Sequence, residues 1–137
     1  MVAETTVTTR DITTRSEAVK LAPVVAALRS TNDFHCTVVA TSSTRKCSAG
    51  SPRLSAFTVD ADLDVMRPNQ TLAGLTARLM DGVDARLELA QPDMALVQRD
   101  TTTVLVASLG CFYRCIPTGH VEAGLRTGNI WAPSPRR

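Results

Sequence analysis

Apolar residues recur at every third or fourth position in two long segments of the chain, a spacing that predicts amphipathic helices. The first helix should cover residues 17–30, with Ser16 as its N-cap and Pro23 either kinking it or delaying its start. The second should cover residues 71–90 and end before Pro92. The apolar positions are Ala18, Leu21, Val25 and Leu28 in the first helix, and Leu72, Leu75, Leu79, Val83 and Leu87 in the second. Each series predicts one buried face.

Short apolar runs between the helices predict strands over residues 36–41, 93–98 and 116–121. A further helix is expected over residues 101–114. The residues expected on its buried side are Val104, Ala107, Ser108, Cys111 and Cys115. Strands that alternate with helices in this way are typical of parallel sheets. The fold class predicted is therefore α/β, with a Rossmann-like parallel sheet and flanking helices.

Two segments fit this pattern less well. The first strand should precede residue 17, where residues 5–14 read TTVTTRDITT. Their β-branched side chains suit a strand, but the segment is too polar for the centre of a parallel sheet. Residues 42–61 are rich in Ser, Gly and Pro without any period, which predicts a loop.

The composition is that of one globular domain. The chain has 137 residues, 44% of them hydrophobic and 20% charged, with a formal net charge of +2. Scattered basic residues and 4% aromatics give no reason to expect nucleic acid as a partner. No apolar run approaches the roughly 18–20 residues of a membrane span, and the N-terminus lacks the layout of a signal peptide. We therefore expect no membrane partner and a cytoplasmic location.

The four cysteines are expected to be reduced thiols in that compartment. Cys111 and Cys115 are four residues apart and close in sequence to His120. A zinc site would need more ligands at closer spacing, so buried and inert cysteines are favoured over a metal site.

Polar residues follow the predicted strands at three places: residues 13–17 with Lys20, residues 98–103 and residues 119–129. Parallel α/β sheets bind ligands beyond the carboxyl ends of their strands, where helix N-termini direct amide groups at anions. Taken together, the three segments predict an anionic ligand handled by carboxylates.

Each candidate residue could also have a purely structural role. Asp100 or Thr101 could cap the following helix, and His120 could be an ordinary hydrogen-bonded histidine. Glu122 and Arg126 are four residues apart and could form an ion pair with each other. A solvated helix face could hold Arg15, Glu17 and Lys20.

Several of these segments resemble one enzyme family, the non-hydrolysing UDP-N-acetylglucosamine 2-epimerases. The strongest match is residues 120–129, HVEAGLRTGN, and the second is residues 100–103, DTTT. Residues 14–25, TRSEAVKLAPVV, resemble the family's opening helix, and residues 62–72 match more loosely. The resemblance covers residues 13–135 apart from roughly 42–61.

The resemblance implies a reversible epimerisation of UDP-GlcNAc to UDP-ManNAc at carbon 2. The family eliminates UDP to form an unsaturated sugar and then adds it back, and it uses no nicotinamide or other cofactor. It also implies a UDP-sugar as ligand and a homodimer as in the family. Residues 1–137 would then be a single partial N-terminal domain of a two-domain glycosyltransferase-B-like fold, with the second domain absent.

The resemblance also implies roles for individual residues. Asp100 and Glu122 would be the catalytic carboxylates, and Arg15 and Lys20 would face the nucleotide or its diphosphate. His120 and Arg126 belong to the substrate-binding motif without an assigned role. With one carboxylate and half of the cleft missing, the isolated chain is expected to be inactive. It could instead be a non-catalytic paralogue that binds a partner or a UDP-sugar, or a decayed remnant without function.

Overall fold

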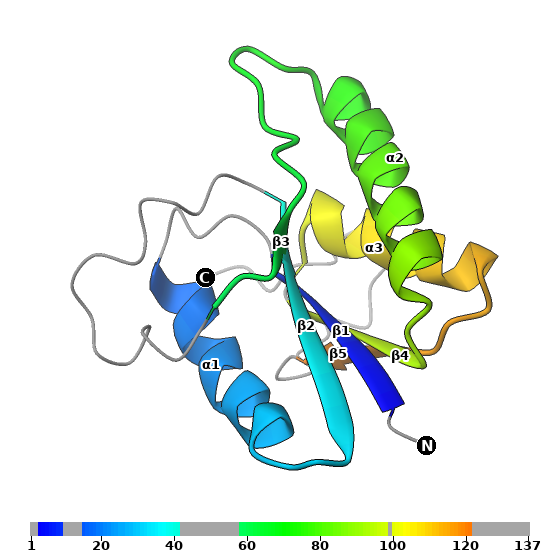
Figure 1. The fold of residues 1–137 in the computed structure, drawn as a ribbon. Coiled ribbons are helices and arrows are strands. Elements are labelled where there is room, and N and C mark those ends of the chain that lie inside the picture. The colour runs from blue at the N-terminus through cyan, green and yellow to red at the C-terminus, as the bar shows by residue number, and fades with distance from the viewer. Residues whose placement is uncertain (1–2, 10–14, 42–57, 99, 122–137) are drawn as a thin grey trace, which may run out of the picture.

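A computed structural model of the chain describes residues 3–9, 15–41, 58–98 and 100–121, with the backbone alone over residues 3–9 and 15–20. Helices and strands alternate along these residues (Figure 1). The helices are α1 (Arg15–Arg29), α2 (Leu72–Ala90) and α3 (Thr102–Tyr113). The strands are β1 (Ala3–Thr9), β2 (Phe34–Ala40), β3 (Ala61–Asp62), β4 (Met94–Gln98) and β5 (Thr118–Val121).

The five described strands form one sheet in the order β3-β2-β1-β4-β5, and every neighbouring pair is parallel. The predicted α/β class with a parallel sheet is confirmed. Because all the strands run in one direction, their carboxyl ends meet at one edge of the sheet, which is where such sheets bind ligands. Within the described ranges, no helix combines the length and apolar content needed to cross a lipid bilayer.

Strand β1 is the central strand, so the expectation that its segment is too polar for this place is wrong. Val7 of β1 is level with Val38 of β2 on one side and with Leu96 of β4 on the other. The ladders are made by backbone groups that every residue carries, and β-branched threonines suit an extended chain. The polarity of the side chains therefore does not exclude the segment from the centre of the sheet.

Helix α1 covers one face of the sheet, and α2 and α3 cover the other (Figure 1). On the first face, Leu21 and Val25 of α1 pack against Cys36 and Val38 of β2. The described core of the opposite face includes Val65, Leu75, Leu79, Val83, Leu87, Ala95, Val106 and Cys111. Strands buried on both faces read as continuous apolar runs, which is why β2 and β4 were visible in the sequence.

Helix α2 agrees most closely with its prediction. The Thr71 hydroxyl oxygen caps its start by accepting a hydrogen bond from the Gly74 amide at 3.1 Å. At its end, Gln91 takes a left-handed conformation with φ 43° and donates its amide to the Leu87 carbonyl at 2.8 Å. Pro92 follows directly, so both ends of the predicted helix are confirmed to within a residue.

Helix α1 begins earlier than predicted. It starts at Arg15, so Ser16 lies inside the helix instead of capping it, and Pro23 does not delay the start. A proline inside a helix removes one backbone hydrogen bond and crowds the preceding turn. Burial of Leu21 and Val25 on both sides of Pro23 holds the helix against the sheet despite that cost.

The predicted loop over residues 42–61 is wrong at its last residue, Ala61, and its residues 42–57 lie outside the described ranges. The Asp60 amide donates to the Val38 carbonyl at 2.9 Å, and the two-residue strand β3 then pairs with the end of β2. A strand this short has no period to detect. Its conformation depends on hydrogen bonds to β2, which only the folded chain provides.

The buried side of α3 differs from the predicted one. Ala107 and Cys111 are buried as expected, but the other buried positions are Thr103, Val106 and Gly110. Residues 102–113 carry no charge, so little in the sequence indicates how the helix is oriented. Gly110 allows close packing against α2, since a Cβ atom there would lie 3.1 Å from Val83 Cγ1. Cys115 follows the helix and is exposed, which contradicts its expected burial.

Candidate functional site

The candidate site lies at the carboxyl end of β4, where α3 begins. Thr101 is the N-cap of α3, and its hydroxyl oxygen accepts from the Val104 amide at 3.5 Å. Asp100 precedes this cap and is exposed. Within the part of the chain that the structure describes, the Asp100 carboxylate makes no hydrogen bond or ion pair. The capping role open to either residue therefore belongs to Thr101.

Asp100 and His120 line the same cavity, of about 580 Å³, although they are far apart in the sequence. The sheet brings them together: β4 and β5 are parallel neighbours, and Val97 is level with His120. The other lining residues are Val97, Thr101, Thr102, Val104, Leu105 and Ser108. The cavity thus combines a carboxylate, an imidazole and hydroxyl groups with one apolar wall.

The start of α3 gives this cavity an electrostatic bias. The first amides of a helix have no partners within the helix, and the helix dipole adds partial positive charge at the same end. Anions are favoured at such a position. The cavity can therefore hold an anionic group near the helix while Asp100 and His120 offer proton-transfer groups to a neutral part of the same ligand.

The structure describes the other residues that the sequence predicted for this site less completely. Arg15 is the first residue of α1 and so follows the carboxyl end of the central strand, while Lys20 lies farther along the same helix. Only their backbone is described, so neither is assigned to the cavity. Glu122 and Arg126 lie outside the described ranges. The structure therefore brings Asp100 and His120 to one cavity. The roles of all six residues stay predictions.

The sequence did not indicate Leu105 as part of this site. Leu105 is one helical turn from Thr101 and Thr102, so helical spacing from the polar motif would have suggested it. Two further polar atoms near the carboxyl edge, Gln98 Oε1 and Thr103 Oγ1, are buried without a hydrogen-bond partner among the described residues. No group of three potential metal-ligating side chains occurs within the described ranges.

Comparison with known proteins identifies relatives over almost the whole chain. A family model described as UDP-N-acetylglucosamine 2-epimerase matches residues 26–136. The chain is 48% identical over 122 residues to the UDP-N-acetylglucosamine 2-epimerase of Yersinia pestis, covering 89% of this chain and 32% of that protein. It is similar to the crystal structure of the Neisseria meningitidis UDP-GlcNAc 2-epimerase bound to UDP-GlcNAc, with TM-score 0.80 and 39% identity.

That structural match covers 96% of this chain and 35% of the Neisseria chain. A second crystal structure of a UDP-N-acetylglucosamine 2-epimerase has TM-score 0.82 and 36% identity, covering 98% of this chain and 37% of the other. The chain thus spans about a third of the length of the relatives it matches. On the strength of the family model and the shared fold, the chain belongs to the UDP-N-acetylglucosamine 2-epimerase family.

Proposed function

We propose that the cavity holding Asp100 and His120 binds a UDP-sugar and contributes catalytic groups to the interconversion of UDP-GlcNAc and UDP-ManNAc. The observation that carries this proposal is the convergence of these two residues, one from each of two sequence motifs, beside the N-terminus of α3. A related structure is described as bound to UDP-GlcNAc, which supports the same ligand class here.

The reaction places distinct demands on the site. The proton on carbon 2 of the sugar is weakly acidic, so its removal needs a positioned base, and Asp100 and Glu122 are the carboxylates proposed for proton transfer. Elimination breaks the bond between carbon 1 and the diphosphate oxygen, and UDP leaves with that electron pair. Re-addition of UDP and return of the proton to the opposite side of carbon 2 complete the epimerisation.

The departing diphosphate needs positive charge and amide dipoles directed at it. The amides at the start of α3 supply the dipoles, and Arg15, Lys20 and Arg126 are the cations proposed for this role. His120 is proposed to contact the sugar or the diphosphate from the β5 side of the cavity. No cofactor enters this scheme, because the hydrogen moves as a proton and UDP acts as leaving group and nucleophile.

Because the chain spans about a third of the length of its relatives, we propose that residues 1–137 bind UDP-GlcNAc without efficient turnover. Calorimetry with UDP-GlcNAc and with UDP tests binding, and an epimerisation assay on the same preparation tests turnover. Heat of binding with little UDP-ManNAc formation is the expected result. Robust turnover would contradict the inactive state, and the absence of heat at millimolar ligand would contradict sugar binding.

We also propose that the chain forms a homodimer through one side of α3. Leu109, Phe112 and Tyr113 follow one another at helical spacing, and Phe112 is 73% exposed. Exposed apolar patches mark interaction surfaces, and this helix carries no charge that would repel a second copy across a two-fold axis.

A further inference from the structure

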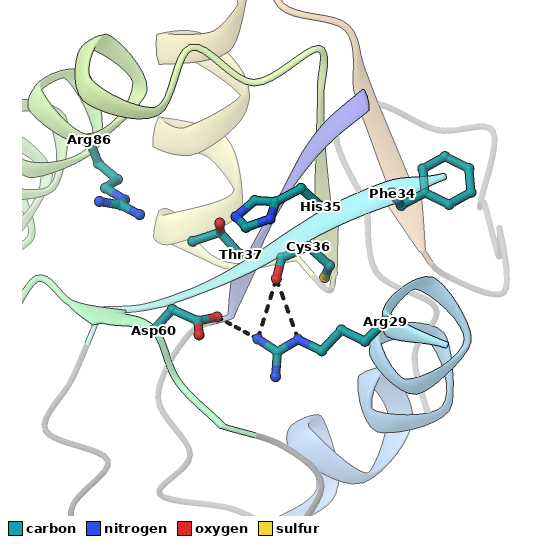
Figure 2. Close-up of a pocket in the computed structure, with 7 residues that line it drawn as sticks. All are labelled: Arg29, Phe34, His35, Cys36, Thr37, Asp60 and Arg86. Atoms are coloured by element: carbon teal, nitrogen blue, oxygen red, sulfur yellow. Dashed lines mark hydrogen bonds and ion pairs between the residues drawn. The ribbon is translucent and has the colours of Figure 1, made fainter. Parts of the chain in front are cut away.

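A second cavity, of about 490 Å³, lies around the first half of strand β2 (Figure 2). Its lining combines residues of α1, β2, α2 and the segment before β3: Arg29, Phe34, His35, Cys36, Thr37, Asp60 and Arg86. His35 and Thr37 lie on the side of β2 that faces Arg86, whereas Arg29 approaches from the other side (Figure 2). This cavity is distinct from the one that contains Asp100, with which it shares no residue.

Arg29 and Asp60 are already engaged with each other and with the backbone. Arg29 Nη2 donates to Asp60 Oδ2 at 2.5 Å, and Arg29 Nη1 donates to the Thr58 hydroxyl at 2.6 Å. The same Asp60 oxygen accepts from the Val38 amide at 2.7 Å. Arg29 also donates to the Cys36 carbonyl from Nε and Nη2, each at 3.4 Å. These contacts cover the edge of β2. They also occupy most of the N–H donors of Arg29, so few donors remain for a ligand.

Arg86, unlike Arg29, has a donor group that is not occupied by the described residues. Its side chain extends from α2 toward His35 and Thr37, and its Nε atom is buried without a hydrogen-bond partner among the described residues. Arg86 also has no ion pair within those residues. An unpaired buried donor on a charged group is costly to a folded protein. Among the described residues that line this cavity, there are two guanidinium groups and one carboxylate, and that carboxylate is paired with Arg29.

We propose that this cavity is a binding site for a carboxylate, with Arg86 as its principal donor. The planar edge of a guanidinium group matches the two oxygens of a carboxylate, and the negative charge of the carboxylate complements the positive charge of the guanidinium. The Thr37 hydroxyl and the His35 imidazole, on the same side of β2, add hydrogen-bonding groups around the ligand. The site would accept the acid group of a small metabolite independently of the nucleotide-sugar site.

The experiment follows the Nε–Hε resonance of Arg86 in a nitrogen-edited NMR spectrum of the full chain, titrated with sodium acetate at constant pH and ionic strength. The expected result is a saturable shift of the Arg86 signal and a rise in melting temperature with acetate. The Arg67 signal is the internal control, because that arginine donates to the Asp64 and Met66 carbonyls outside the cavity. It should not move.

Two variants separate binding from general salt effects. Arg86→Gln should abolish the saturable rise in melting temperature, and Thr37→Val should weaken acetate binding roughly tenfold, the order expected for one lost hydrogen bond. Arg67→Gln, the matched control, should behave like the unaltered chain. An Arg86 signal that follows chloride as well as acetate, or that saturates with inorganic phosphate and not acetate, would overturn the proposal. Acetate stabilisation that survives Arg86→Gln would overturn it as well.

Discussion

Arg114 donates from Nε to Asp84 Oδ1 at 2.6 Å, a contact that ties the end of α3 to the middle of α2. The same guanidinium reaches Glu88, one turn farther along α2, with 3.3 Å between Nη2 and Oε2. The hydrogen bond from Arg114 is the main cause that holds the pKa of Asp84 below its ordinary value. The two helices that cover one face of the sheet are therefore joined by an ion pair as well as by apolar packing.

The lowered pKa of Asp84 predicts a pH-dependent contribution to stability. The folded chain keeps this carboxylate charged at pH values where the unfolded chain begins to bind a proton, so its contribution is present above the ordinary pKa of 3.8 and is lost as pH falls through the folded value. Asp84→Asn should therefore lower the urea midpoint at pH 7 and lower it less at about pH 3. Asp81→Asn, on the same helix, is the control, and an equal effect at both pH values would contradict the prediction.

Asp60 protects the edge of β2 through its contact with the Val38 amide. Asp60→Ala should destabilise the chain by about 1–3 kcal/mol, because it leaves a sheet amide without its acceptor. Asp60→Asn keeps an acceptor oxygen and loses only the charge that faces Arg29. Because this ion pair is partly exposed to solvent, the loss should be about 1 kcal/mol or less. Urea unfolding of both variants checks this order, and equal losses would show that the charge dominates.

Asp100 should be dispensable for stability and important for the proposed site. Because it is exposed and Thr101 caps the helix, Asp100→Asn should change the free energy of unfolding by no more than about 0.5 kcal/mol. The same variant should alter UDP-GlcNAc binding in calorimetry. Asp33→Asn, an exposed carboxylate before β2, is the matched control and should bind like the unaltered chain. A destabilised Asp100→Asn would instead indicate a structural role.

The proposed dimer predicts that a charge on α3 separates the subunits. Phe112→Glu should convert a dimer into a monomer, because two buried carboxylates would face each other across the two-fold axis. Light scattering coupled to size-exclusion chromatography measures the mass. Leu72→Glu is the control, since Leu72 is also 73% exposed but lies at the start of α2. A chain that is monomeric before any substitution would contradict the proposal.

The three described cysteines should react at different rates. Burial is the main cause that raises the pKa of both Cys36 and Cys111, and it also restricts access to their thiols, whereas Cys115 is exposed. In a Cys47→Ser variant at pH 8, a thiol reagent should modify Cys115 rapidly. The other two should react only after denaturant is added. Peptide mapping by mass spectrometry assigns the sites, and rapid labelling of Cys111 in the folded chain would contradict this order.

The sequence by itself determined the elements with a strong period or a continuous apolar run. Leucine and valine at four-residue spacing specified α2, and Thr71 and Pro92 marked its ends, because these signals act within one turn of the helix. The runs that became β2 and β4 were visible since both faces of each strand are buried. Helices alternating with such strands leave a parallel sheet as the simplest arrangement, and that fold class is confirmed.

Only the tertiary structure decided the features that depend on contacts between distant segments. β1 is central despite its polar residues because β2 and β4 satisfy its backbone from both sides, and β3 exists only through hydrogen bonds to β2. The uncharged α3 was oriented by packing against α2. The pairing of β4 with β5 placed Asp100 and His120 in the lining of one cavity, and the packing of α2 placed Arg86 in a second cavity with His35 and Thr37. A local pattern cannot encode such neighbours, because each depends on the burial and hydrogen bonding of both segments at once.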